Sequence, residues 1–206
     1  MFFSLLTLFA VQIVAVSLPG PDFLVVVRST LKHGRMAGYL CSLGITTGVL
    51  IYCSFAVFGL SLISEDNHWV LNLVSALGAC FLLYMSYKCF TSKSQITKQE
   101  MKEEERSSKK TAWLTGLATN ISNPKVIVFF LSILPLFMKD YHSISYHIAV
   151  ILVIIVTTAL WFSMITILIG HKMIRNFFLN YSHVLEKIFG VVLILFAIGL
   201  LISIFN

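Results

Sequence analysis

Charged residues are scarce in this sequence. Only 12% of its 206 residues are Asp, Glu, Lys or Arg, whereas a soluble domain of this size carries about 25%. Hydrophobic residues make up 58% of the chain, and the mean hydropathy is +0.90. So few polar residues cannot cover the surface of a water-soluble globule. The apolar segments must therefore face lipid or one another, and the composition predicts an integral membrane protein.

Signatures of enzyme chemistry are missing as well. The chain has no H-E-x-x-H, G-x-S-x-G or Walker A motif. Its six histidines lie in or near predicted loops without metal-ligand spacing, and none of its four cysteines forms a C-x-x-C pair. We therefore predict neither an enzyme nor a resident metal or cofactor. An ATP-driven pump would need a partner to supply the ATPase.

Six long apolar runs stand out along the chain. Crossing a hydrocarbon core of about 30 Å takes roughly 20 helical residues. Helices are expected because an open sheet would leave unpaired backbone groups in lipid. The first run lacks the positively charged start of a signal peptide, so we expect it to be retained. The predicted spans are approximately 2–27, 37–63, 69–88, 112–138, 145–169 and 186–205.

The formal net charge of +6 is unevenly distributed among the connections. The first, third and fifth connections are rich in Lys and Arg, the second has none, and the fourth has only Lys139 beside Asp140. Basic loops stay in the cytoplasm according to the positive-inside rule. The alternation predicts that both termini lie on the non-cytoplasmic side. It also explains the positive charge without a nucleic-acid partner.

The only long polar segment is predicted to be a cytoplasmic linker at 91–111. It separates a first group of three spans, at 1–90, from a second group at 112–206 within a single membrane domain, 1–206. Because three is an odd number, the second group must enter the membrane from the opposite side.

The two groups also share a short motif. Laying Pro21 on Pro124 places Asp22 on Lys125, and five apolar residues follow in both copies. Such similarity is typical of transporters built from inverted repeats. The predicted fold class is all-α: six transmembrane helices forming two inverted three-helix repeats, with helices one and four broken at the proline motifs.

The prolines have a specific chemical consequence. A proline inside a helix removes a hydrogen bond and frees the carbonyl four residues earlier. The carbonyls expected to be freed belong to Ala15 (by Pro19), Ser17 (by Pro21) and Asn120 (by Pro124). Free carbonyls can accept hydrogen bonds from an ammonium group or bind a cation, and the start of the resumed helix favours a carboxylate. An amino-acid zwitterion carries both groups, although a plain proline kink remains the alternative.

Asp22 and Lys125 are the most informative residues. A charge near the middle of a span costs about 2.5–3.5 kcal/mol, so it normally faces the interior of the bundle and has a partner. Because the two residues are equivalent in the repeats, we expect them to meet there. A structural ion pair is one interpretation. In the functional one, Asp22 binds a proton or the substrate ammonium, and Lys125 attracts the carboxylate.

Other polar residues are candidates for the same cavity. Asn120 and Asn123 lie near one helix face, where they either line the cavity or cap the break. The predicted site therefore comprises Asp22, Lys125, Asn120, Asn123, Pro19, Gly20, Pro21 and Pro124. Weaker candidates are Thr46, Thr47, Gln12, Tyr84, Tyr87, Thr157, Thr158 and Trp161. For Thr46 and Thr47, inside the G-x-x-x-G pattern, close helix packing is favoured, and packing is also favoured for Trp161.

At Pro19-Gly20-Pro21-Asp22 and Asn123-Pro124-Lys125 the chain resembles the lysine exporter (LysE) superfamily, and within it the homoserine/threonine-resistance branch. The likeness covers nearly the whole chain, including the stretch 43–49. It implies a multi-pass exporter of small neutral amino acids, similar to threonine or homoserine, in the bacterial inner membrane. Proton antiport would drive export, and both termini would be periplasmic. Relatives often have an acidic residue where Thr157 or Thr158 stands, so the resemblance leaves the coupling site open.

The expected partners are thus an amino-acid substrate, protons and the lipid bilayer. The oligomeric state stays open, with a homodimer among the options. Two other functions are weighed. A metal or other cation exporter could use the freed carbonyls and Asp22, but Lys125 argues against it. A thiol-disulfide electron carrier would need paired cysteines, which the sequence lacks.

Overall fold

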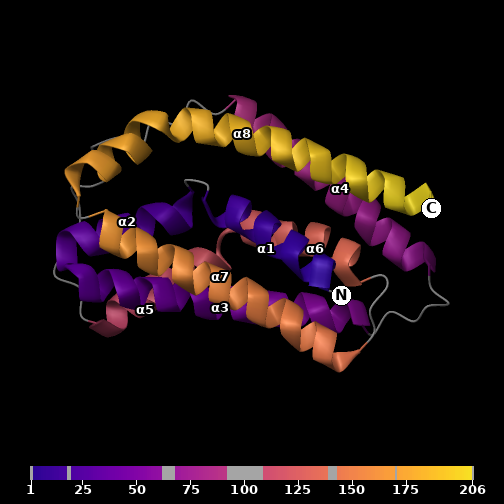
Figure 1. Ribbon diagram of the computed structural model, residues 1–206, viewed down its shortest axis with the longest axis horizontal. Coiled ribbons are helices and arrows are strands. Elements are labelled where there is room, and N and C mark those ends of the chain that lie inside the picture. Colours follow the sequence, from indigo (N-terminus) through magenta and orange to yellow (C-terminus); the bar gives the residue numbers. More distant parts are fainter. Residues whose placement is uncertain are drawn as a thin grey trace.

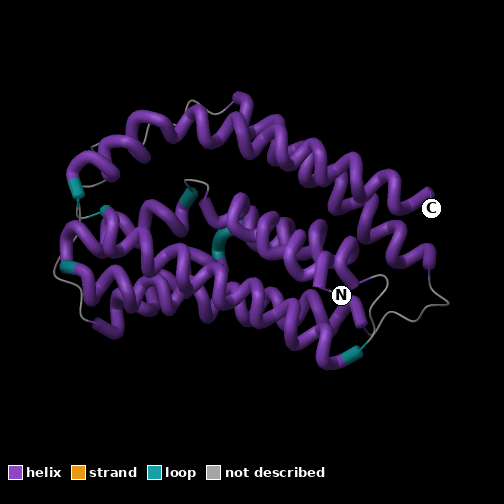
Figure 2. The backbone as a smooth tube through the Cα atoms, viewed as in Figure 1, coloured by secondary structure: helices purple, strands orange, loops and turns teal. Residues whose placement is uncertain are grey.

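The structure of the protein is a computed structural model that describes residues 2–17, 20–61, 68–91, 109–138, 143–169 and 171–205. These residues form helices joined by short turns, with no strand among them (Figures 1 and 2). The helices are α1 (Phe2–Ser17), α2 (Pro21–His33), α3 (Arg35–Ser61), α4 (His68–Thr91), α5 (Lys109–Ile121), α6 (Pro124–Met138), α7 (Ile144–Leu168) and α8 (Lys172–Phe205).

Both helices that were predicted to be broken are interrupted at their proline motifs. The chain bends by 62° between α1 and α2. Gly20 has an extended conformation and precedes Pro21, the first residue of α2, where the missing N–H of proline costs no helical hydrogen bond. α5 ends at Ile121, and α6 likewise begins with a proline, Pro124. Pro19 lies outside the described residues.

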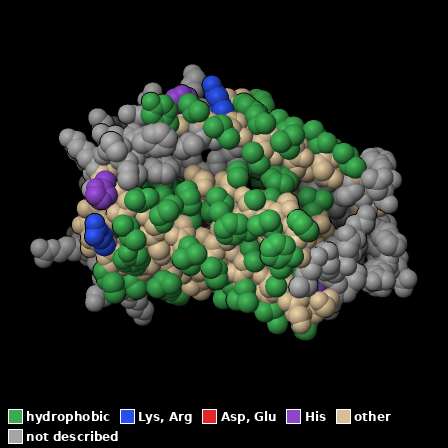
Figure 3. All heavy atoms as spheres, in the orientation of Figure 1, with side chains coloured by type: hydrophobic (Ala, Val, Ile, Leu, Met, Phe, Trp, Pro, Cys, Tyr) green, Lys and Arg blue, Asp and Glu red, His purple; other side chains and the backbone are tan. Residues whose placement is uncertain are grey.

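The outer surface of the helices is apolar. On α7, a stripe of large side chains spaced by four residues is exposed: Ile148, Leu152, Val156, Leu160 and Met164. The threonines of this helix, at 157, 158 and 166, are buried instead. Hydrophobic side chains spread over the visible face of the molecule in Figure 3. This pattern is the reverse of that on a soluble helix and suits contact with lipid.

Two described helices are individually long and apolar enough to cross a bilayer, Arg35–Gly59 in α3 and Ile144–Leu168, which is α7. The bent pair α1–α2 is a third span if it is counted as one. The chain is therefore a polytopic α-helical membrane protein.

The helices pack in two groups (Figure 1). α3 is the centre of the larger group, because it contacts α2, α5, α6 and α7, while α1 packs against α7. α4 packs along α8, and a small cluster of buried apolar side chains lies between these two helices. α4 also contacts α6. The N and C termini lie at the same end of the molecule.

Glycines bring α3 and α5 into backbone contact. A Cβ atom on Gly44 would collide with the carbonyl oxygen of Trp113, and one on Gly116 would collide with that of Cys41. A Cβ atom on Gly48 would lie 2.5 Å from Oδ1 of Asn120. The packing role predicted for the G-x-x-x-G pattern is thus confirmed, and it holds Asn120 against α3.

The region between the fifth and sixth predicted spans was expected to be a connection, but α8 already begins at Lys172. The basic part of this connection is thus helical, because no Gly or Pro interrupts the chain from 172 until Gly190. Its place on the cytoplasmic side stays a prediction. The predicted linker, apart from 91 and 109–111, lies outside the described residues.

Candidate functional site

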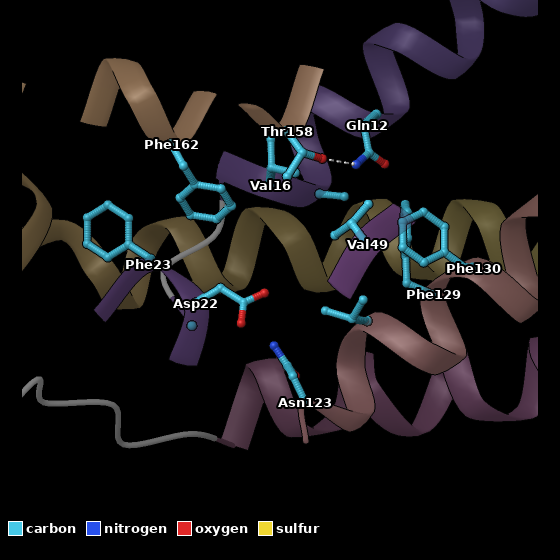
Figure 4. A pocket seen from close by; sticks show the side chains of 13 residues that line it. Gln12, Val16, Asp22, Phe23, Val49, Asn123, Phe129, Phe130, Thr158 and Phe162 are labelled. Atoms are coloured by element: carbon cyan, nitrogen blue, oxygen red, sulfur yellow. Dashed lines mark hydrogen bonds between the residues drawn. The ribbon is translucent and has the colours of Figure 1, made fainter. Parts of the chain in front are cut away.

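A cavity lies where the break between α1 and α2 approaches the break between α5 and α6 (Figure 4). The volume of the cavity is about 60 Å³, several times the roughly 10–15 Å³ that one water molecule needs. The cavity therefore suits a small solute. Its polar side chains are Gln12, Asp22, Asn123 and Thr158.

Asp22 stands in the first turn of α2 and is partly buried. Its Oδ2 atom accepts a hydrogen bond of 2.8 Å from Nδ2 of Asn120, which is fully buried near the end of α5. The positive end of the α2 dipole also favours a carboxylate at this position. One hydrogen bond thus links the two broken helices through the acidic side chain.

The predicted contact of Asp22 with Lys125 cannot be assigned in the same way. Lys125 follows Pro124 in the first turn of α6, but the side chains of both residues lie outside the described part of the structure. The pairing therefore stays a prediction. The described hydrogen bond of Asp22 is with Asn120, which the sequence placed in the cavity without identifying its partner.

The backbone at the second break is not free. The carbonyl of Asn120 accepts a hydrogen bond of 3.1 Å from the N–H of Asn123, and the carbonyl of Ile121 accepts one from the hydroxyl of Tyr52. Pro124 therefore removes the helical partner of the Asn120 carbonyl, as expected, and the protein itself supplies another partner. Buried backbone groups are almost always paired, and here a tight turn supplies the partner. At this break, side chains rather than bare carbonyls provide the polarity of the cavity.

Gln12 and Thr158 form a second polar link across the cavity wall. Gln12 is only 2% exposed, and its Nε2 atom donates a hydrogen bond of 3.1 Å to Oγ1 of Thr158. The hydroxyl of Thr158 in turn donates to the carbonyl of Ile154 at 2.8 Å. This chain of hydrogen bonds joins α1 to α7.

Several weaker candidates lie away from the cavity. Thr46 and Thr47 donate hydrogen bonds to carbonyls of their own helix and do not line it. Tyr84 is 51% exposed on α4, with the ammonium of Lys88 5.5 Å from its ring centroid. Trp161 packs against the apolar core, as the sequence favoured. Tyr87 is exposed, and Thr157 is buried against its own helix.

The apolar wall of the cavity was not foreseen. It is formed largely by four phenylalanines: Phe23, Phe129, Phe130 and Phe162. Their signal is hidden because the chain contains 17 phenylalanines. Phe23 directly follows Asp22, and Phe129 and Phe130 lie within two turns of Pro124. Proximity to a proline motif is thus the one signal that could have identified three of the four.

Comparisons with known proteins identify the family of the chain. A family described as LysE type translocator matches residues 13–204. The chain is 30% identical over 200 residues to the threonine efflux protein of Escherichia coli strain K12. The matched region covers 96% of this chain and 97% of that protein. The threonine efflux protein of Salmonella typhimurium strain LT2 is 30% identical over 199 residues, with the same coverage. A membrane protein of Bacillus subtilis, YrhP, is 28% identical over 205 residues, covering 95% of this chain and 97% of its own. No solved structure matches. The chain belongs to the LysE family of translocators.

Proposed function

We propose that this protein exports small neutral amino acids, similar to threonine or homoserine, from the cytoplasm by proton antiport. The observation that carries the proposal is the small cavity between two broken helices, in which the carboxylate of Asp22 is held by Asn120. Membership of a translocator family and the similarity to threonine efflux proteins support the same function.

The cavity offers complementary sites for the two charges of a zwitterion. The carboxylate of Asp22 attracts an ammonium group. Asn123, which is buried and lines the cavity, stands just before the first residue of α6. The positive end of that helix favours the carboxylate of the substrate, and Lys125 in the same turn remains the predicted additional attraction.

A single carboxylate also provides a mechanism for exchange. Moving an uncompensated charge through a membrane domain is costly. Asp22 is therefore paired with the substrate ammonium on the way out and protonated on the way in, so that each cycle carries one positive charge inward for each zwitterion exported. Because the two ligands compete for one group, their movements are coupled.

The energetics require such coupling. A zwitterion has no net charge, so the membrane potential does no work on it. One proton entering through about 150 mV supplies roughly 3.5 kcal/mol. At about 1.4 kcal/mol per tenfold, this sustains an outward gradient of about 300-fold.

We further propose six spans in two inverted repeats, with α1–α2 and α5–α6 each counted as one broken span. Helix contacts that would be equivalent under this symmetry support it. The contact of α3 with α5 corresponds to that of α7 with α1, and the contact of α3 with α6 corresponds to that of α7 with α2. The shared position of the two termini agrees with an even number of spans (Figure 1).

The topology can be tested with reporters. In the bacterial inner membrane, an enzyme that is active only in the periplasm should give activity when it is fused after Asn206. It should be inactive when it is fused after Lys102, because the basic linker is expected in the cytoplasm. The opposite pattern would rule out this orientation, and activity at both sites would rule out three spans between the linker and the C-terminus.

Export itself can be tested in cells. Overproduction should raise resistance to toxic external threonine or homoserine and lower the internal pool of the same amino acid, compared with an empty vector. Adding an uncoupler should stop net export against a gradient, because the proton supplies the work. If neutral amino acids leave no faster than with the vector alone, export is refuted. Uphill export that continues with the uncoupler would refute proton antiport only.

A further inference from the structure

We infer that Gln12 selects substrates whose side chain carries a hydroxyl group, an inference that rests on the proposed amino-acid export. The starting point is an unused acceptor. Among the described residues, Oε1 of Gln12 has no hydrogen-bond partner although it is buried. A buried acceptor without a partner is unfavourable and rare in proteins, so its presence in the wall of a cavity needs an explanation.

The hydrogen bonds around Gln12 fix which end of its amide is unused. The hydroxyl of Thr158 has one proton, and it is donated to the carbonyl of Ile154. Thr158 can therefore only accept from Gln12, which must present its NH₂ group to it. The remaining end of the amide is the carbonyl oxygen, and only a donor such as a hydroxyl or an ammonium group can satisfy it.

The position of Gln12 decides between these two donors. Figure 4 shows Gln12 and Thr158 on one side of the cavity and Asp22 and Asn123 on the other. We expect the charged groups of a zwitterion to bind on the side of Asp22, because the carboxylate of Asp22 pairs with the substrate ammonium. The side chain of the substrate then extends toward Gln12, between apolar walls that include Val49 and Phe162.

The expected consequence is discrimination between isosteric side chains. Threonine can donate its hydroxyl proton to Gln12, whereas valine has the same shape but leaves the acceptor unpaired. A site built to hydrogen-bond a hydroxyl rejects the analogue that lacks it more strongly than an apolar pocket can. The carboxylate of Asp22 gives coupling, and the amide of Gln12 gives selectivity.

The test is counterflow of radiolabelled threonine and valine in proteoliposomes containing the purified protein. The wild type should prefer threonine by about tenfold or more. Gln12→Leu, which removes the acceptor at similar volume, should bring the ratio close to one, by slowing threonine and not valine. Thr157→Val is the matched control. It removes a buried hydroxyl from the neighbouring position, which does not line the cavity, and it should keep the wild-type preference.

The outcomes separate the two levels of the proposal. If the wild type transports neither amino acid nor any other neutral one, the proposed export fails. If it transports them but Gln12→Leu keeps the preference for threonine, the role of Gln12 is overturned and export stands. Should Gln12→Leu not fold, Gln12→Met removes the acceptor with an unbranched side chain. Competition by unlabelled valine on the wild type needs no variant: valine that competes as well as threonine would also overturn the inference.

Discussion

Asp22→Asn is expected to lower the rate of threonine counterflow by about 100-fold or more. Removing one member of a buried charged interaction costs about 2–5 kcal/mol, and roughly 3 kcal/mol corresponds to about 100-fold. Asparagine has nearly the same shape, and its side-chain oxygen can still accept the hydrogen bond from Asn120. Folding should therefore survive, while the ability to bind a proton or an ammonium group is lost.

Two further variants separate charge from structure. Asp22→Glu keeps the carboxylate but lengthens its reach, so partial activity is expected. Asn120→Ala removes the described hydrogen bond and keeps the charge, so it should lower thermal stability more than Asp22→Asn does. Counterflow rates and Tm values in detergent provide both readouts. A normal rate in Asp22→Asn would show that the carboxylate takes no part in transport.

Gly44→Ala is expected to cause a large loss of stability although it adds only one methyl group. A Cβ atom at this position collides with the backbone of α5 at Trp113 and Leu117, which cannot rotate away as a flexible side chain could. Overpacking of this kind costs about 3 kcal/mol. For a chain of this length that lowers Tm by roughly 6–12 °C, which can be measured by thermal unfolding in detergent.

The same helix provides the matched control. Gly59 lies in α3, and a Cβ atom added to it would have no atom of the described residues within 4 Å. Gly59→Ala should therefore leave Tm unchanged or slightly raised, because alanine is the better helix former. Equal Tm values for both variants would mean that α3 and α5 do not touch through their backbones. Gly44→Ala should also reduce transport, since the same contact holds Asn120 beside α3.

Local features of the sequence predicted much of this fold. Apolar runs located the helices, and the Gly44–Gly48 spacing predicted the close packing that the structure contains. The two helix breaks were predictable from each proline together with the residue before it. Pro135 lies inside α6 without ending it, whereas Pro21 and Pro124 follow Gly20 and Asn123, which readily leave the helical conformation.

The contacts between residues far apart in the chain could not be predicted from the sequence. Gln12 and Thr158 are 146 positions apart, and Asp22 and Asn120 are 98 apart. Neither pair has a shared spacing or motif that would connect them. The sequence favoured opposite charges as partners because Coulomb attraction is the simplest reason to pair buried groups, and so it did not foresee the amide of Asn120. These contacts depend on helix packing that no single segment specifies.

The most direct test of the central claim is counterflow of radiolabelled threonine into proteoliposomes that contain excess unlabelled threonine. The proposed exchange through the cavity predicts that wild-type protein accumulates label transiently above its equilibrium level, while Asp22→Asn and protein-free liposomes do not. Label that enters wild-type proteoliposomes no faster than protein-free ones, for threonine, homoserine and other neutral amino acids alike, would contradict it.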